Sequence, residues 1–235
     1  MKIGRIFIIG LLAVSQASAQ QEQRKNFASC PVVQDTKTVP CWLSEYGGEL
    51  YYLGIQTDPP YLGHKVLVEG VVSNEPRICG GIVLKPVVVS PLPEFDSLCN
   101  TILPAVDKYT VPSASRPPGP VAAPTGPEFP IYYDFDAPIM GRHAGILTQI
   151  VEYAEKSQAK RITVTGYRGA TLLSDKTVLT EQAGIAKARA EEVADLLKRA
   201  GLSKTVIQVT FRDQPEPARG IDDWRSRRTT VRVEP

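Results

Sequence analysis

The sequence predicts an α+β protein in which a small disulfide-stapled all-β domain precedes a domain of alternating strands and helices. Three observations support this class. The first half holds short β-branched runs between turn residues, the second half alternates strand patterns with amphipathic helices, and a proline-rich segment separates them. A chain of 235 residues is long enough for two small domains. We expect a signal segment over 1–19, an all-β domain over 20–105, a linker over 106–128 and an α/β domain over 129–235.

The first nineteen residues have the pattern of a secretory signal peptide. Lys2 and Arg5 precede an apolar run from Ile6 to Val14, and Ala17-Ser18-Ala19 supplies small residues for cleavage. The apolar run is shorter than the ~18–20 residues that a spanning helix needs. We therefore expect secretion, and we expect no transmembrane segment in the rest of the chain.

The charge of the secreted chain argues against two classes of partner. Without Lys2 and Arg5, 25 of the 27 basic residues remain, and they equal the 25 acidic residues. A balanced charge is unlike the strong positive charge of proteins that bind nucleic acid or anionic membranes. We expect no nucleic-acid partner.

Four cysteines lie in the first half, and the sequence favours two disulfides between them. They are Cys30, Cys41, Cys79 and Cys99, with no C-x-x-C pair, and the chain has only two histidines. This spacing does not suit a zinc site. In an oxidising compartment each bridge contributes about 2–4 kcal/mol to a small domain. Three pairings are possible, and the sequence does not choose between them.

The expected β domain begins after an irregular polar lead-in over 20–37. Strand patterns follow over 49–55, 65–72 and 82–89, separated by turn clusters such as Asp58-Pro59-Pro60. The stretch 62–72 resembles the second strand of a small OB-like barrel, with Gly70 where such a strand bends. His64 is interpreted as a strand-end residue, and a ligand contact is the alternative.

A proline-rich spacer and a repeating strand–helix pattern follow. Seven prolines between 112 and 130 exclude a regular helix or central strand and favour an extended spacer. Strand patterns then lie at 129–136, 162–165, 206–211 and 229–233, with helix patterns at 146–154 and 222–228. A longer helix carries Ala186, Ala190, Val193 and Leu197 on one face and ends at Gly201. The expected order is β-α-β-α-β-(α)-β, a sheet covered by helices.

Five motifs occur in one order across residues 129–235. They are Tyr133-Asp134-Phe135-Asp136, Ile162-Thr163-Val164-Thr165-Gly166-Tyr167, Ile185-Ala186-Lys187-Ala188-Arg189-Ala190, Asp213-Gln214-Pro215-Glu216-Pro217 and Ser226-Arg227-Arg228. In this order and spacing they resemble the OmpA-like domain, the periplasmic module that binds peptidoglycan. The resemblance implies a periplasmic protein associated with the cell wall or the outer membrane.

The resemblance also implies a ligand site around Arg189. The family holds the diaminopimelate of the stem peptide, and Arg189 stands where an arginine binds its carboxylate. A guanidinium suits a carboxylate because it offers a planar fork of donors, worth about 1.5–3 kcal/mol. Arg227 would support the same cleft. The alternatives are a surface pair between Arg189 and Glu192 and, for Arg227, a solvated face.

This chain departs from the family where the ammonium of the ligand would be bound. The family's aspartate falls on Gly169, and Tyr167 and Arg168 replace the preceding histidine and threonine. Asp175 or Asp213 is a candidate substitute for the missing acid. The sequence thus predicts half of the usual ligand site.

The predicted function is non-covalent binding of peptidoglycan by a soluble tether or adaptor, with other envelope proteins as further partners. The first alternative is a protein-interaction adaptor that has lost wall binding. A cell-wall hydrolase with an unrecognised site is a third interpretation. Asp134 and Asp136 could form a carboxylate pair as in a glycoside hydrolase, but they more simply mark the end of a strand. The sequence holds no hydrolase, metalloprotease or phosphate-loop motif, so we expect no enzyme activity and no cofactor.

Overall fold

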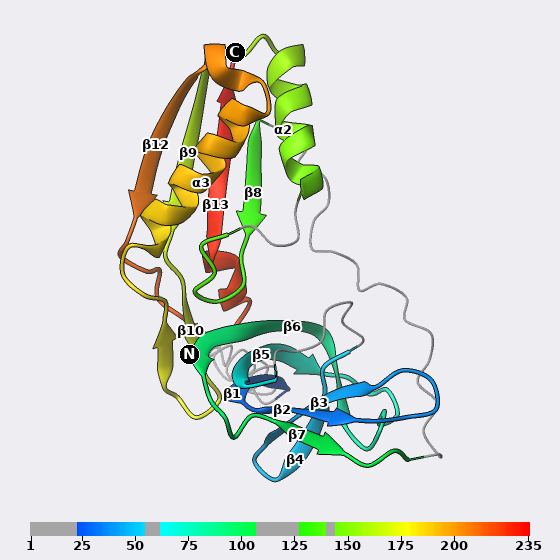
Figure 1. The fold of residues 1–235 in the computed structure, drawn as a ribbon. Coiled ribbons are helices and arrows are strands. Elements are labelled where there is room, and N and C mark those ends of the chain that lie inside the picture. Colours follow the sequence, from blue (N-terminus) through cyan, green and yellow to red (C-terminus); the bar gives the residue numbers. More distant parts are fainter. Residues whose placement is uncertain (1–22, 55–61, 107–126, 140–143) are drawn as a thin grey trace, which may run out of the picture.

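The computed structural model describes residues 23–54, 62–106, 127–139 and 144–235. The expected signal segment and nearly all of the expected linker lie outside these residues. The described residues are mostly β structure, with two α-helices and two disulfides. Figure 1 shows the first-half sheet below the second-half sheet and its helices.

The first half forms one seven-stranded sheet. Its order is β1-β5-β6-β4-β3-β2-β7. Only Cys30 separates β1 from β2, yet β1 pairs with β5 at one edge of the sheet, and β2 pairs with β3 and β7 near the other edge (Figure 1). The strands are β1 (Arg24–Ser29), β2 (Pro31–Gln34), β3 (Cys41–Tyr46), β4 (Glu49–Tyr52), β5 (His64–Val72), β6 (Ile82–Phe95) and β7 (Thr101–Leu103).

The expectation of an irregular lead-in over 20–37 is wrong, because β1 and β2 lie there. Phe27 of β1 and Val33 of β2 are buried, and Phe27 stacks on Tyr46 with ring centroids 4.8 Å apart. The stretch expected as the second strand of a barrel is β5, the fifth strand along the chain. Its buried residues Val66 and Val68 join Phe27 in the core of this half.

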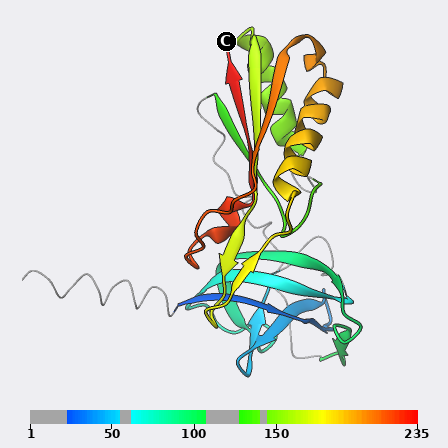
Figure 2. The ribbon, with the colours of Figure 1, turned by 90° about the vertical axis from the view of Figure 1, so that its left-hand side faces the viewer.

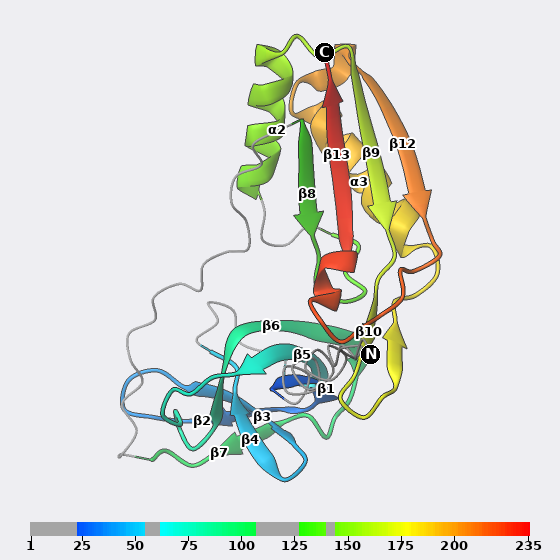
Figure 3. The ribbon, with the colours of Figure 1, turned by 180° about the vertical axis from the view of Figure 1, so that it is seen from behind.

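The second half is a four-stranded sheet with two helices on one face (Figures 1 and 3). The order is β12-β9-β13-β8, with β12 parallel to β9 and β13 antiparallel to β9 and β8. The elements are β8 (Glu128–Tyr132), α2 (Ala144–Lys156), β9 (Arg161–Tyr167), α3 (Ile185–Arg199), β12 (Val206–Arg212) and β13 (Arg228–Glu234), with 3-10 turns η1 (Leu202–Lys204) and η2 (Asp223–Ser226). Every strand and helix expected in this half has a counterpart, although the strand expected over 129–136 ends at Tyr132 and the short helix expected over 222–228 is the 3-10 turn η2.

Helix α3 packs closely on β9 because both surfaces carry small residues. A Cβ on Gly166 would lie 1.9 Å from the carbonyl oxygen of Ala186, so only glycine fits there. Ala190, on the same helix face, is fully buried. The helix ends at Arg199, and Gly201 follows with φ 111°, as the sequence predicted. This close packing fixes the position of Arg189, one residue before Ala190.

An unexpected hairpin between β9 and α3 reaches the first half. It consists of β10 (Ala170–Leu172) and β11 (Val178–Thr180), and Figure 2 shows it crossing to the β1 end of the lower sheet. The hairpin contacts Asn26 in β1, whose side-chain amide donates to the carbonyl of Leu172. The N–H of Asn26 donates to the Ser174 hydroxyl, and the N–H of Ser174 donates to the carbonyl of Asn26. The two halves are therefore in direct contact. Among the described residues, no helix has the length and hydropathy to cross a membrane.

Candidate functional site

Arg189 lies on the buried face of α3 and its side chain is 0 % exposed. Its five N–H groups all have acceptors within the chain. Nη1 and Nη2 donate to Glu181 Oε2 at 2.9 Å and Oε1 at 2.5 Å. The other three bonds go to the carbonyl oxygens of Ala137, Tyr167 and Asp134, at 2.9, 3.2 and 3.2 Å. The guanidinium thus has no donor left for a ligand.

Glu181 completes this arrangement from the segment between β11 and α3. Its carboxylate is fully buried and accepts four hydrogen bonds. Two come from Arg189, and two come from the backbone N–H groups of Asp136 at 2.9 Å and Gly169 at 2.7 Å. These four donors converge on one position and form a binding site for a carboxylate, which the side chain of Glu181 occupies. The alternative of a surface pair between Arg189 and Glu192 is replaced by this buried pair.

Tyr133 lies against the same pair, with its ring centroid 4.5 Å from the guanidinium carbon of Arg189. Burial raises the pKa of Tyr133 to about 12. An aromatic face close to a desolvated guanidinium adds a cation–π attraction.

We expect ionisation of Tyr133 to destabilise the fold in alkaline solution. In the unfolded chain the phenol has its ordinary pKa of about 10, whereas in the folded chain burial raises the pKa of Tyr133 to about 12. The neutral phenol therefore contributes stability that is present below pH 10 and is lost between pH 10 and 12, on the order of 3 kcal/mol in all. Urea unfolding measured from pH 10 to pH 12 should show a smaller decrease in the free energy of unfolding for Tyr133→Phe than for the native chain. Equal decreases would contradict the assignment.

Arg227 forms a second buried pair, and this one joins the two halves. It is 0 % exposed and donates from Nη2 to Glu69 Oε2 at 2.5 Å. Its Nη1 donates to the Thr171 hydroxyl at 3.0 Å, and that hydroxyl donates to Glu69 Oε1 at 3.1 Å. Glu69 lies on β5 of the first half. The alternative of a solvated face for Arg227 is therefore wrong, since this side chain is a contact between the two sheets.

Gly169 lies between the two arginine pairs. Its N–H donates to Glu181, and a Cβ at this position would lie 2.4 Å from Arg227 Cγ and 2.8 Å from Ser226 Oγ. An aspartate here, as the OmpA-like pattern has, would displace Arg227. Glycine at position 169 thus leaves the space in which Arg227 reaches Glu69.

The structure separates the remaining predicted residues from the Arg189 pair. Tyr167 contributes its carbonyl oxygen, while its ring faces Arg228 at 4.2 Å and Arg212 at 5.6 Å. Asp175 lies at the turn between β10 and β11, where it accepts hydrogen bonds from Thr177, and these bonds lower its pKa. Asp213 accepts from the N–H of Gly184 before α3. Neither Asp175 nor Asp213 is among the acceptors of Arg189.

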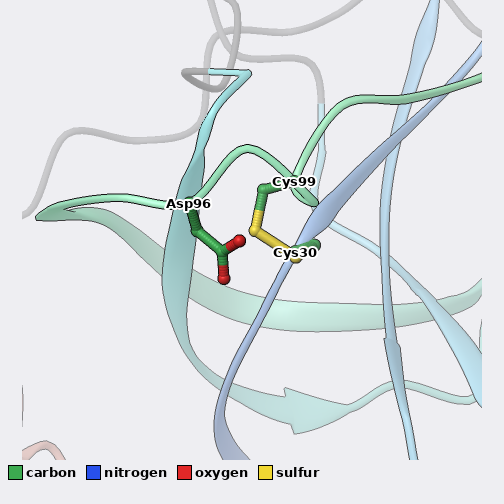
Figure 4. A group of neighbouring side chains, drawn as sticks. All are labelled: Cys30, Asp96 and Cys99. Carbon is green, nitrogen blue, oxygen red and sulfur yellow. A yellow bond between two sulfur atoms is a disulfide. The ribbon is translucent and has the colours of Figure 1, made fainter.

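The two disulfides predicted from the cysteines are confirmed, and their pairing is now known. Cys30 bonds to Cys99, and Cys41 bonds to Cys79. Asp96 approaches the first bridge closely enough to form a group with metal-ligand spacing (Figure 4). Because both sulfur atoms are joined to each other, they offer no thiolate to a metal ion. The group is therefore a disulfide with a neighbouring carboxylate.

Similarity to known proteins is weak and is found among solved structures. No protein-family model and no curated protein matches the sequence. Among solved structures, the OmpA-like domain of FopA1 from Francisella tularensis subsp. tularensis SCHU S4 is similar, with a TM-score of 0.34 and 18% identity. The match covers 46% of this chain and 72% of that one.

Sequence reasoning missed the residues that decide both arginine environments. These are Glu181, Glu69 and Thr171. Glu69 carried a signal, since it is a single charge inside the apolar run Val66–Val72, and a buried charge requires a partner. Glu181 had no comparable signal, because its segment is short and polar and it meets Arg189 only after the hairpin folds.

Proposed function

We propose that this chain is a secreted envelope protein that acts as a structural adaptor for other proteins, without binding the peptidoglycan stem peptide through Arg189. This corresponds to the first alternative of the sequence analysis. The observation that carries it is the complete occupation of the Arg189 site by Glu181. The envelope location rests on the signal-peptide pattern, the disulfides and the OmpA-like motifs.

A ligand that binds Arg189 through a carboxylate has to replace the carboxylate of Glu181. A ligand carboxylate can reach Arg189 only if Glu181 leaves, and Glu181 would then lose four hydrogen bonds in a fully buried position. Breaking a buried pair of this kind costs about 3–5 kcal/mol. A charge-assisted bond to the ligand returns about 1.5–3 kcal/mol. The cost exceeds the gain, so Glu181 is expected to remain bound to Arg189.

We also propose that the first half is an OB-like barrel. With β1 and β2 counted as one strand, the pairing runs from β1/β2 to β3, β4, β6 and β5 and back to β1. This closed ring of five antiparallel and parallel pairings supports a small Greek-key barrel of the OB type. Held to the second half by Arg227 and Asn26, it would present its surfaces in a constant orientation.

The proposal includes no catalysis and no cofactor. The two carboxylates of the hydrolase interpretation each take part in packing contacts. Asp134 accepts from the Ser90 hydroxyl at 3.4 Å, and Asp136 accepts from the N–H of Gln182 at 2.6 Å. These bonds support structural roles for both residues.

Co-sedimentation with purified peptidoglycan sacculi tests the proposal. We expect the secreted chain to remain in the supernatant with or without free diaminopimelate, because its carboxylate site is filled. Retention on sacculi that free diaminopimelate competes away would overturn the proposal and favour the tether. The same incubation should release no muropeptides, and their release would favour the hydrolase.

A further inference from the structure

Strand β12 forms an edge of the second sheet. It pairs with β9, and no described strand pairs with its other side. Figures 1 and 3 both show it at the outer margin of the sheet, away from α2 and from the first half. A strand at such an edge presents backbone groups that can pair with another chain.

The hydrogen bonds at the two ends of β12 show which backbone groups face outward. The N–H of Val206 donates to the carbonyl of Lys160, and the carbonyl of Arg212 accepts from Arg168. Because backbone direction alternates along a strand, residues 206, 208, 210 and 212 face β9. The N–H and C=O groups of Ile207, Val209 and Phe211 are therefore directed away from the sheet.

The side chains of these three residues make the edge apolar. Ile207 packs against the core beneath the helices, and its register partner on β9 is the buried Ile162. Val209 and Phe211 lie on the same face and are 38% and 52% exposed. Edge strands are usually protected by lysine, proline or a bulge. From Val206 to Phe211 this strand has no charged residue, no proline and no glycine.

We propose that β12 pairs antiparallel with β12 of a second copy of this chain, with Val209 at the two-fold axis. In this register Val209 lies opposite Val209, and Ile207 lies opposite Phe211 of the other copy. Each opposed pair exchanges two N–H···O bonds through the outward groups identified above. The result is one continuous sheet across two molecules.

The edge of β12 is complementary to itself, and this favours a second copy of the chain as its partner. A two-fold interface requires one surface to match itself, and this edge does so in both backbone and side chains. On the opposite sheet face, Gln208 meets Thr210 and Val206 meets Arg212, so no like charges oppose each other. Formation of this dimer does not depend on whether Glu181 or a ligand carboxylate occupies the Arg189 site.

A cysteine at the axis gives the sharpest test. All four native cysteines are in disulfides, so Val209→Cys introduces a single free thiol. Hydrogen-bonded antiparallel partners have Cα atoms about 5.5 Å apart, within the range that a disulfide spans. We expect Val209→Cys to form an interchain disulfide on mild oxidation. Val178→Cys, at an exposed site on β11, is the matched control and should remain monomeric.

Light scattering and sedimentation velocity provide the second readout. The native chain should show twice its monomer mass in the micromolar range, and Val209→Lys should weaken the dimer about tenfold or more by opposing two charges at the axis. Val178→Lys should leave the dimer unchanged. A native chain that stays monomeric would overturn the proposal. So would a dimer unaffected by Val209→Lys, or equal cross-linking of the two cysteine variants.

Discussion

Replacing Glu181 by alanine is expected to lower the free energy of unfolding by about 3–5 kcal/mol, because it leaves the buried Arg189 charge without its carboxylate. The same change leaves the N–H groups of Asp136 and Gly169 without their acceptor. Urea denaturation followed by circular dichroism measures the loss. The control is Glu191→Ala on the exposed side of α3, where the ion pair with Lys187 at 3.7 Å should contribute less than about 1 kcal/mol.

A small carboxylate should restore part of this stability. Alanine at 181 leaves a space lined by the two Nη atoms of Arg189 and two backbone N–H groups, and acetate has the size and charge of the lost group. We expect acetate to raise the unfolding midpoint of Glu181→Ala more than chloride does at equal ionic strength, and to leave Glu191→Ala unchanged. Equal effects of both salts on Glu181→Ala would show that the donors do not form a carboxylate site.

Removing one partner of the Arg227–Glu69 pair is expected to cost a similar amount, about 3–5 kcal/mol, and to weaken the contact between the halves. Glu69→Met leaves Arg227 buried with the Thr171 hydroxyl as its remaining side-chain partner. We expect the unfolding transition of this variant to separate into two steps, whereas the native chain unfolds in one. Glu75→Ala breaks the exposed ion pair with Lys85 and should change stability by about 1 kcal/mol or less.

A double-mutant cycle measures the interaction energy between Glu69 and Arg227 apart from their contacts with other residues. Glu69→Met with Arg227→Met replaces both charges by apolar side chains of similar length, and such replacements of buried pairs are often neutral. The double variant should therefore be more stable than either single variant. If the costs of the two single changes simply add, the two residues do not interact as the structure indicates.

Periodicity along the chain was sufficient to predict most elements of the second half. The apolar face of α3, its stop at Gly201 and the alternation in β9 and β12 are local features, and each appears where the sequence predicts it. The first half was less predictable. Strands β1 and β2 show no alternation of buried and exposed residues, and they pair with β5 and β7 far along the chain, so their stretch lacks a strong local pattern.

Arg189 itself was identifiable from the motif order, but its environment was not. The sequence by itself determined which arginines are unusual, which residues form the helices and strands of the four-stranded sheet, and that the cysteines pair. Only the tertiary structure decided that Glu181 fills the Arg189 site, that Glu69 reaches Arg227 from the other half, and which cysteines are joined. The physical reason is that a buried charge is satisfied by partners brought together in space, and the spacing of residues along the chain does not encode those partners.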